Sequence, residues 1–198
     1  MTVADPNGEL LRAAAAGDAD GAARALAAGA DIEARDDLQR TSLLLAAAAD
    51  HVEVARLLVS NGADPDALDA QHDTPWLVTG VTGSVAMLEA LLPAHPDLGI
   101  VNRFGGVSVI PAAERGHVDY VRRVVTTGID VNHVNRLGWT ALLEAVLLGE
   151  GGEAHQEIVR ILLAAGADPS IPDKDGVTAL HHARARGHVA IAELLEAG

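Results

Sequence analysis

A short sequence motif that begins with threonine or valine recurs along this chain at intervals of 33, 33, 33 and 38 residues. The motif begins at Thr41, Thr74, Val107, Thr140 and Thr178. A second motif, Gly-Ala-Asp or Gly-Ile-Asp, recurs with the same spacing and begins at Gly29, Gly62, Gly128 and Gly166. A period of about 20 to 50 residues predicts an array of stacked units, because one such unit cannot bury its own apolar face.

Every repeat follows the same order. An Ala/Leu-rich stretch (42–49) follows Thr41, a second apolar-periodic stretch (52–60) comes next, and a polar segment leads to the following threonine. Threonine before an apolar run predicts a helix N-cap, and Gly116 and Gly187 sit where a left-handed residue would end a helix. Their fixed offset favours this capping role over a flexible hinge. Helices this short are marginal alone, so packing between repeats must stabilise them.

The sixth copy reads Thr178-Ala179-Leu180-His181-His182-Ala183, followed by Gly187-His188-Val189. This resembles the ankyrin repeat, a 33-residue unit of a β-turn and two helices with the signature T-P-L-H-x-A. The resemblance implies an all-α repeat fold, an ankyrin solenoid of stacked helix-turn-helix units with β-turn fingers. We expect a single domain, 1–198, made of six repeats at approximately 5–35, 36–68, 69–101, 102–134, 135–172 and 173–198.

The family resemblance also implies a non-enzymatic module that binds another protein on its concave face of fingers and first helices. The fourth and fifth fingers stand out because their side chains are apolar or basic, where other fingers are polar. The predicted contact residues there are Arg103, Phe104, Arg136, Leu137 and Trp139. Aromatic and arginine side chains dominate interface hot spots, which favours a partner rich in acidic and apolar residues. The alternative is that Phe104 and Trp139 pack against neighbouring fingers.

Polar residues on the first helices add three further candidates. Glu144 and His182 occupy the same offset in consecutive repeats, and Glu114 faces the same groove one turn further along. Adjacent helices lie about 8–10 Å apart, so Glu144 and His182 could approach each other. An acid–imidazole pair would suit a small-molecule or catalytic groove. The competing interpretation, partner contacts in the groove, is preferred, and we predict no enzyme activity.

Three irregular segments depart from the repeat. In the third repeat Pro93 and Pro96 predict an early end to the second helix, and in the fourth Pro111 falls inside the first helix. The fifth repeat carries an insertion at 148–155, whose glycines and acidic residues predict a mobile loop. Glu150, Glu153 and His155 lie in it, but a flexible loop cannot place metal ligands rigidly. We therefore predict no metal site and no cofactor, since the chain also lacks H-E-x-x-H spacing and a phosphate loop.

Composition narrows the partners. The formal charge is −14 and the sequence has no basic stripe, which disfavours binding to nucleic acid. The negative charge is explained by solubility or by binding to a basic partner. The sequence has no run of 18 apolar residues, so we expect no membrane span. Because it also has no leader pattern at its start, the expected location is cytoplasmic. Thirteen arginines against the single Lys174, with abundant Ala and Gly, indicate a bacterial genome. We expect a monomer; the alternative is a dimer through the C-terminal repeat, whose last helix (189–195) keeps an apolar face.

Overall fold

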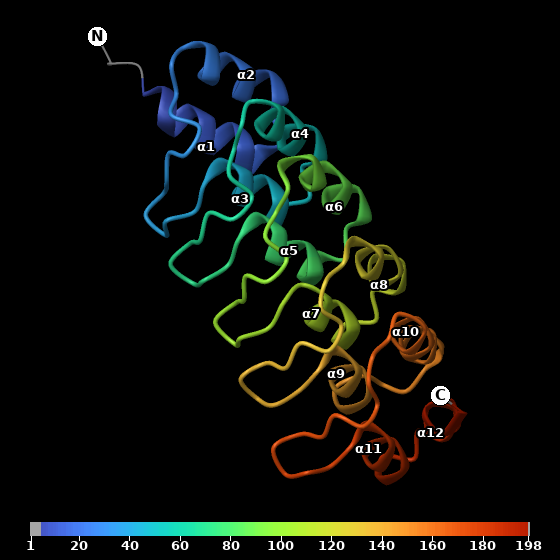
Figure 1. The fold of residues 1–198 in the computed structure, drawn as a ribbon. Helices are drawn as coiled ribbons and strands as arrows, with labels where there is room; N and C mark the ends of the chain where they lie inside the picture. The colour runs from blue at the N-terminus through green and yellow to red at the C-terminus, as the bar shows by residue number, and fades with distance from the viewer. Residues whose placement is uncertain (1–4, 198) are drawn as a thin grey trace. The chain divides into compact units, whose positions relative to one another are not determined.

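The computed structural model describes residues 5–197, in which twelve α-helices follow one another in pairs (Figure 1). The chain forms two compact units, Met1–Ile100 and Val101–Gly198, named here the N-terminal half and the C-terminal half. The division falls within one residue of the predicted boundary between the third repeat (69–101) and the fourth (102–134). The single continuous domain over 1–198 stays a prediction.

In the N-terminal half the first helices of successive repeats pack in one row and the second helices in another. The first row consists of α1 (Pro6–Ala16), α3 (Ser42–Ala48) and α5 (Pro75–Thr82). The second row consists of α2 (Ala19–Ala27), α4 (Val52–Ser60) and α6 (Val85–Leu91). The segments between a second helix and the next first helix project to one side of the helices (Figure 1). These segments are the fingers.

The C-terminal half repeats the arrangement. Its first row is α7 (Val109–Glu114), α9 (Ala141–Leu147) and α11 (Ala179–Ala185), and its second row is α8 (Val118–Val124), α10 (Glu153–Ala164) and α12 (Val189–Ala197). Residues 5–197 contain no β-strand, and their one isolated bridge joins Arg35 to Thr41. The predicted all-α stacked repeat is therefore confirmed. Within the described residues no helix is long and apolar enough to cross a bilayer.

The predicted caps set where the first helices begin. The hydroxyls of Thr41, Thr74 and Thr140 each accept a hydrogen bond from the backbone N–H three residues on. Thr178 is the exception, because its hydroxyl lies 2.8 Å from Nδ1 of His181 instead. Gly187 is left-handed after α11 with φ +72°, as its predicted capping role requires.

Each half has its own core, built mainly from aliphatic side chains and one fully buried aromatic residue. Trp76 and Tyr120 are both fully buried, because the apolar face of each helix turns toward the adjacent repeat. In the third repeat α6 ends at Leu91 and gives way to a 3₁₀ turn, Leu92–Ala94, which confirms the early end predicted from the prolines. Pro111 is tolerated as the third residue of α7, near the start of the helix, where a missing N–H costs little.

The insertion in the fifth repeat is more ordered than its composition suggested. Glu153 is the first residue of α10, so residues 153–155 form a helical turn. His155 is buried, and its Nε2 lies 2.9 Å from the backbone oxygen of Glu114. The predicted mobile loop is wrong for these three residues, because the buried imidazole fixes them against α7. Among the described residues, no group of three acidic, histidine or cysteine side chains could hold a metal ion.

Candidate functional site

Five fingers share one hydrogen-bonded turn. Each turn starts with an Asp or Asn whose side-chain oxygen accepts from the backbone N–H groups two and four residues later, and these residues are Asp36, Asp69, Asn102, Asn135 and Asp173. Such Asx turns fix the loop locally. Our sequence reasoning missed this role. The signal was present, because each of these residues precedes the start of its repeat motif by five positions.

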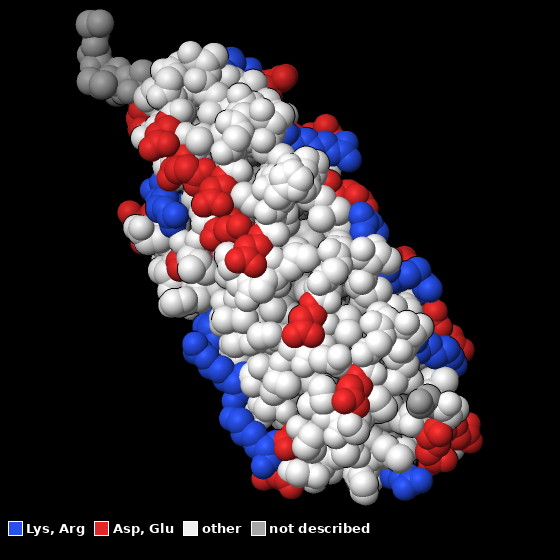
Figure 2. Space-filling model, in the orientation of Figure 1, with Lys and Arg blue, Asp and Glu red and all other residues white. Residues whose placement is uncertain are grey.

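In the C-terminal half neighbouring fingers are tied together by basic side chains. Arg136 donates from its backbone N–H to the Phe104 oxygen at 2.9 Å and from Nη1 to the Arg103 oxygen at 2.7 Å. Lys174 Nζ donates to the Arg136 oxygen in the same manner. Arg103, Arg136 and Lys174 are all exposed, and Figure 2 shows a row of basic side chains along the edge of this half.

Two large apolar side chains stand exposed on these tied fingers. Phe104 is 54% exposed and Leu137 is 50% exposed. The guanidinium carbon of Arg103 lies 4.7 Å from the centre of the Phe104 ring, a cation–π distance. Phe104 and Leu137 both line a hollow of about 320 Å³ between the fingers and helices α7 and α9. Trp139 is partly buried and does not line this hollow.

The hollow also contains two acidic side chains. Glu114, the last residue of α7, and Glu144, in α9, both line it. Glu144 is only 6% exposed, and its Oε1 accepts a hydrogen bond from Nδ2 of Asn135 at 2.7 Å. Burial, and then the charge of Glu114, raise the pKa of Glu144 to about 7, against the lowering effect of the Asn135 bond. Two of the predicted first-helix candidates therefore meet in one place.

His182, the third first-helix candidate, lies elsewhere. Its Nε2 is 2.6 Å from Oδ2 of Asp173, in the finger of its own repeat, and it does not line the hollow. The predicted approach of Glu144 and His182 is not what the described residues show. Each side chain instead bonds to the Asx residue nine positions earlier, because that residue lies beside it in the same repeat. The pair that a general acid–base groove would need is not formed.

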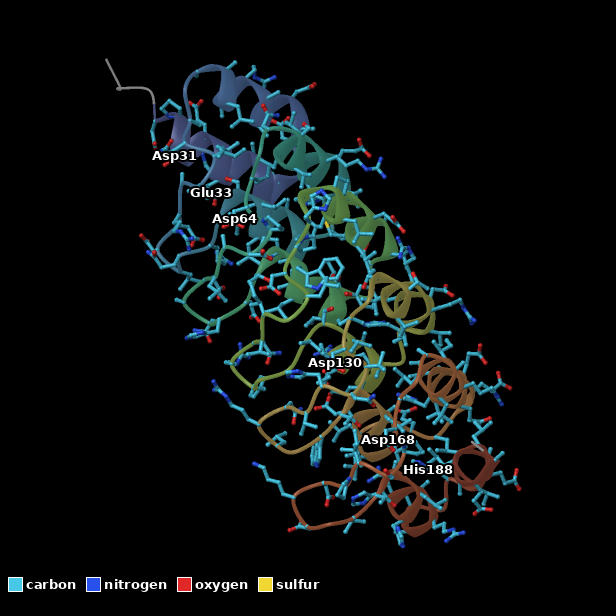
Figure 3. All side chains as sticks on the ribbon, in the orientation of Figure 1. Asp31, Glu33, Asp64, Asp130, Asp168 and His188 are labelled. Atoms are coloured by element: carbon cyan, nitrogen blue, oxygen red, sulfur yellow. The ribbon has the colours of Figure 1, made fainter. Side chains whose placement is uncertain are left out.

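Acidic side chains dominate the N-terminal half instead. Residues 1–100 carry 16 acidic and 5 basic side chains, against 12 and 9 in residues 101–198. Asp31, Glu33 and Asp64 lie on the connections that follow second helices (Figure 3). Acidic side chains here hold neighbouring connections together. Glu33 Oε1 accepts a hydrogen bond from the Asp64 N–H at 2.8 Å, and the Asp66 carboxylate accepts one from the Asp97 N–H at 3.0 Å. Figure 2 shows a band of acidic side chains on one face of this half.

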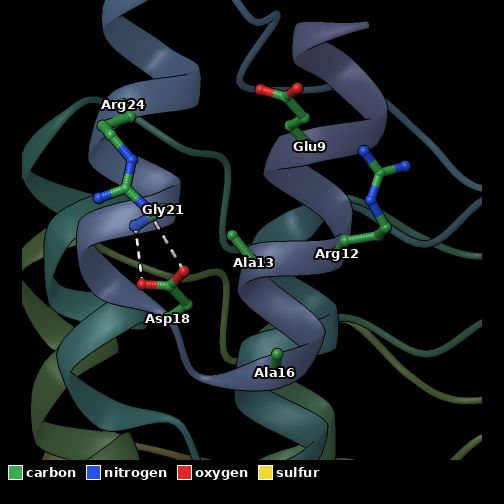
Figure 4. Close-up of a pocket in the computed structure, with 7 residues that line it drawn as sticks. All are labelled: Glu9, Arg12, Ala13, Ala16, Asp18, Gly21 and Arg24. Carbon is green, nitrogen blue, oxygen red and sulfur yellow. Dashed lines mark hydrogen bonds and ion pairs between the residues drawn. The ribbon is translucent and has the colours of Figure 1, made fainter.

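A second hollow, of about 340 Å³, lies between α1 and α2 (Figure 4). One of its polar groups, Asp18, already caps α2 through the Gly21 N–H at 2.8 Å and lies 3.7 Å from Arg24. None of the large exposed apolar side chains lines it. The hollow beneath Phe104 and Leu137 is therefore the stronger candidate for a binding site.

Comparison with known proteins relates the chain to ankyrin repeat proteins. Family models described as ankyrin repeats match residues 10–102, 77–173 and 152–196. The ankyrin repeat protein YahD of Escherichia coli (strain K12) is 51% identical over 106 residues, which are 53% of this chain and 53% of YahD. Human mitochondrial disaggregase is 39% identical over 66 residues, 33% of this chain and 9% of that protein. The chain thus matches about half of the first relative's length and a small part of the second's.

Solved structures resemble the chain over nearly its full length. An ankyrin repeat domain from Acinetobacter baumannii AYE has a TM-score of 0.91 at 46% identity, covering 95% of this chain and 96% of that one. The ankyrin repeat protein EF0377 has a TM-score of 0.92 at 36% identity, covering 98% of both chains. The ankyrin repeat domain of Bcl-3, a member of the IkappaB family, has a TM-score of 0.85 at 27% identity, covering 96% and 85%.

Proposed function

The chain belongs to the ankyrin repeat family, and from this premise we propose that it is a non-catalytic module that binds another protein. The binding surface is the finger and first-helix face of the C-terminal half. The observation that carries the proposal is the exposure of Phe104 and Leu137 beside the same hollow. Large apolar side chains exposed together beside a recess mark a site of protein interaction, and aromatic side chains such as Phe104 are enriched in interfaces.

The fingers that carry these anchors are held before any partner arrives. Their Asx turns and the bonds from Arg136 to the preceding finger fix the loop backbone. A surface that is already ordered loses little conformational entropy on binding, which favours affinity. Trp139, which is partly buried, supports the finger rather than contacting the partner in this proposal.

The charge distribution favours this half as the place of contact for acidic residues of the partner. Residues 101–198 have a formal charge of −3, against −11 for residues 1–100. Arg103, Arg136 and Lys174 stand at equivalent positions on successive fingers. Complementary charges at a rim steer the partner and set its orientation. The cytoplasmic location and the monomeric state stay predictions.

A random peptide display library selected on the wild-type protein tests the proposal. Enriched peptides are then titrated by calorimetry against the wild type and the Phe104→Ser/Leu137→Ser double variant. We expect the double variant to bind at least about tenfold more weakly, a loss of about 1.4 kcal/mol.

The matched control is Leu38→Ser. Leu38 occupies the same finger position in the N-terminal half and is 51% exposed, so this variant removes an exposed leucine away from the proposed surface. Peptides that bind the double variant as well as the wild type would contradict the proposal, as would a library that yields no binder.

A further inference from the structure

The acidic groups in the hollow lack the counter-charge that buried carboxyl groups normally have. No residue described in the structure bonds to Oε2 of Glu144, and no ion pair there involves Glu144 or Glu114. Glu144 is nevertheless 94% withdrawn from solvent, being 6% exposed, and its side chain lines the hollow. Burying a carboxyl group that lacks hydrogen-bond partners destabilises the folded protein. A ligand that donates hydrogen bonds to Glu144 would therefore bind more favourably.

Much of the wall around these acids is apolar. Phe104 and Leu137 stand at the finger side, and Ile110, Pro111 and Leu148 line the helix side. A ligand that fits both parts needs an apolar stem followed by a donor-rich, positively charged end. Lysine and arginine side chains have this construction, since their methylene stems pack on apolar surface while the head stays polar. An acidic group would be repelled, and a purely apolar one would leave Oε2 of Glu144 without a hydrogen-bond donor.

We propose that the hollow receives one lysine or arginine side chain of the protein partner, with its stem between Phe104 and Leu137 and its cationic head against Glu114 and Glu144. The inference rests on the proposed function and adds to it the chemistry of the central anchor. Together with the basic fingers, it describes a partner segment in which one basic residue is flanked by acidic ones.

The charged groups around Glu144 support a cation as guest. At the end of α7 they are Glu114, whose charge acts on Glu144, and Arg115, which follows the helix and lies at an exposed part of the lining. On α10 His155 is engaged with the Glu114 backbone oxygen, and on α11 His182 is engaged with Asp173. The finger contributes the neutral Asn135. With its pKa raised to about 7, Glu144 is part protonated at neutral pH, and a bound cation favours its ionised form.

Binding of a cation is therefore coupled to release of a proton from Glu144. The affinity rises with pH from 6 to 8, by up to about tenfold, which is the change in the ionised fraction of a carboxyl group whose pKa is about 7. A guest held by apolar contact alone has no such dependence.

Carbon-13 NMR of the glutamate carboxyl groups tests this on the intact protein, with n-butylguanidinium chloride as the probe. We expect saturable shifts of the Glu144 resonance, a lower Glu144 pKa at saturation and tighter binding at pH 8 than at pH 6. Equal concentrations of n-butanol, which has the stem without the charge, and of sodium chloride are the controls. Glu114→Gln and Glu144→Gln are each expected to weaken probe binding several-fold, with folding checked by proton NMR.

The proposal is overturned if the probe acts no differently from sodium chloride or butanol, or if both glutamine variants bind it as the wild type does. It is also overturned if selected peptides keep their affinity when their basic residues are changed to glutamine. In those cases the proposed protein-binding function stands or falls separately, on the Phe104→Ser/Leu137→Ser comparison.

Discussion

Asn135 joins its finger to the first helix of the same repeat by donating from Nδ2 to Glu144 Oε1 at 2.7 Å. At the same time its Oδ1 accepts from the backbone N–H groups of Leu137 and Trp139. Asp173 and His182 form the corresponding link in the sixth repeat at 2.6 Å. The corresponding helix positions of the second, third and fourth repeats are Leu45, Val78 and Pro111, which have no side-chain acceptor. Among the described residues this polar link therefore occurs in the last two repeats only.

Replacing Asn135 separates its two roles. Asn135→Ala leaves the two finger N–H groups without their acceptor and is expected to lower the free energy of unfolding by about 1–3 kcal/mol. Asn135→Asp keeps the acceptor but cannot donate to Glu144 and adds a second carboxylate, so it should raise the pKa of Glu144 further. Urea unfolding and carboxyl NMR titration measure the two effects. Asp69→Asn, in a repeat whose partner position is Val78, is the control. Equal unfolding midpoints for the alanine and aspartate variants would contradict this division.

Glu144 should make stability depend on pH. Its folded-state pKa of about 7 lies above the ordinary value of 4.5, so its favourable contribution is complete below pH 4.5 and is lost as pH rises through 7. Glu144→Gln cannot ionise, and relative to the wild type it should gain stability between pH 4.5 and 8, by up to about 3 kcal/mol. Chemical unfolding across this range measures the difference, with Glu150→Gln as a control for the loss of one acidic side chain. A difference that stays constant with pH would refute the assignment.

Gly105 should tolerate alanine less well than Gly176, although both occupy the same finger position. Their φ values are +75° and +77°, so alanine costs about 1–2 kcal/mol at either position. A Cβ at Gly105 would lie 2.7 Å from Cγ of Arg136, whereas nothing lies within 4 Å at Gly176. Gly105→Ala should therefore lose more unfolding free energy than Gly176→Ala. Identical losses would mean that the Arg136 stem moves aside without cost.

Trp76 should accept phenylalanine far better than alanine. The side chain is fully buried, and its Nε1–H has no hydrogen-bond partner among the described residues. Trp76→Ala opens a cavity and should cost about 3–5 kcal/mol. Trp76→Phe loses less volume and removes the unpaired N–H, so its cost should be well below that of alanine. Thermal unfolding of the two variants checks this, and a phenylalanine variant as unstable as the alanine one would show that the indole N–H is satisfied.

The repeat period, the helix caps and the core positions could all be predicted from the sequence. Thr41, Thr74 and Thr140 cap helices as predicted, and Trp76 is buried at the offset that the repeat assigns to a core leucine. These features follow from local rules, because a cap involves residues three positions apart and the burial of each position recurs with the period. Each repeat thus carries the same cap and core signals in its own sequence.

Only the tertiary structure decided what the individual polar side chains do. The sequence placed Glu144 and His182 at the same offset, but not the bonds that direct one to Asn135 and the other to Asp173. It placed Glu114 and Glu144 in one groove, but it did not bring Phe104 to the same hollow or order the start of the insertion through the bond from His155 to Glu114. A hydrogen bond or a pKa depends on distances of a few ångströms between particular groups, within one repeat for Glu144 and Asn135 and between repeats for His155 and Glu114. The repeat period does not specify such distances.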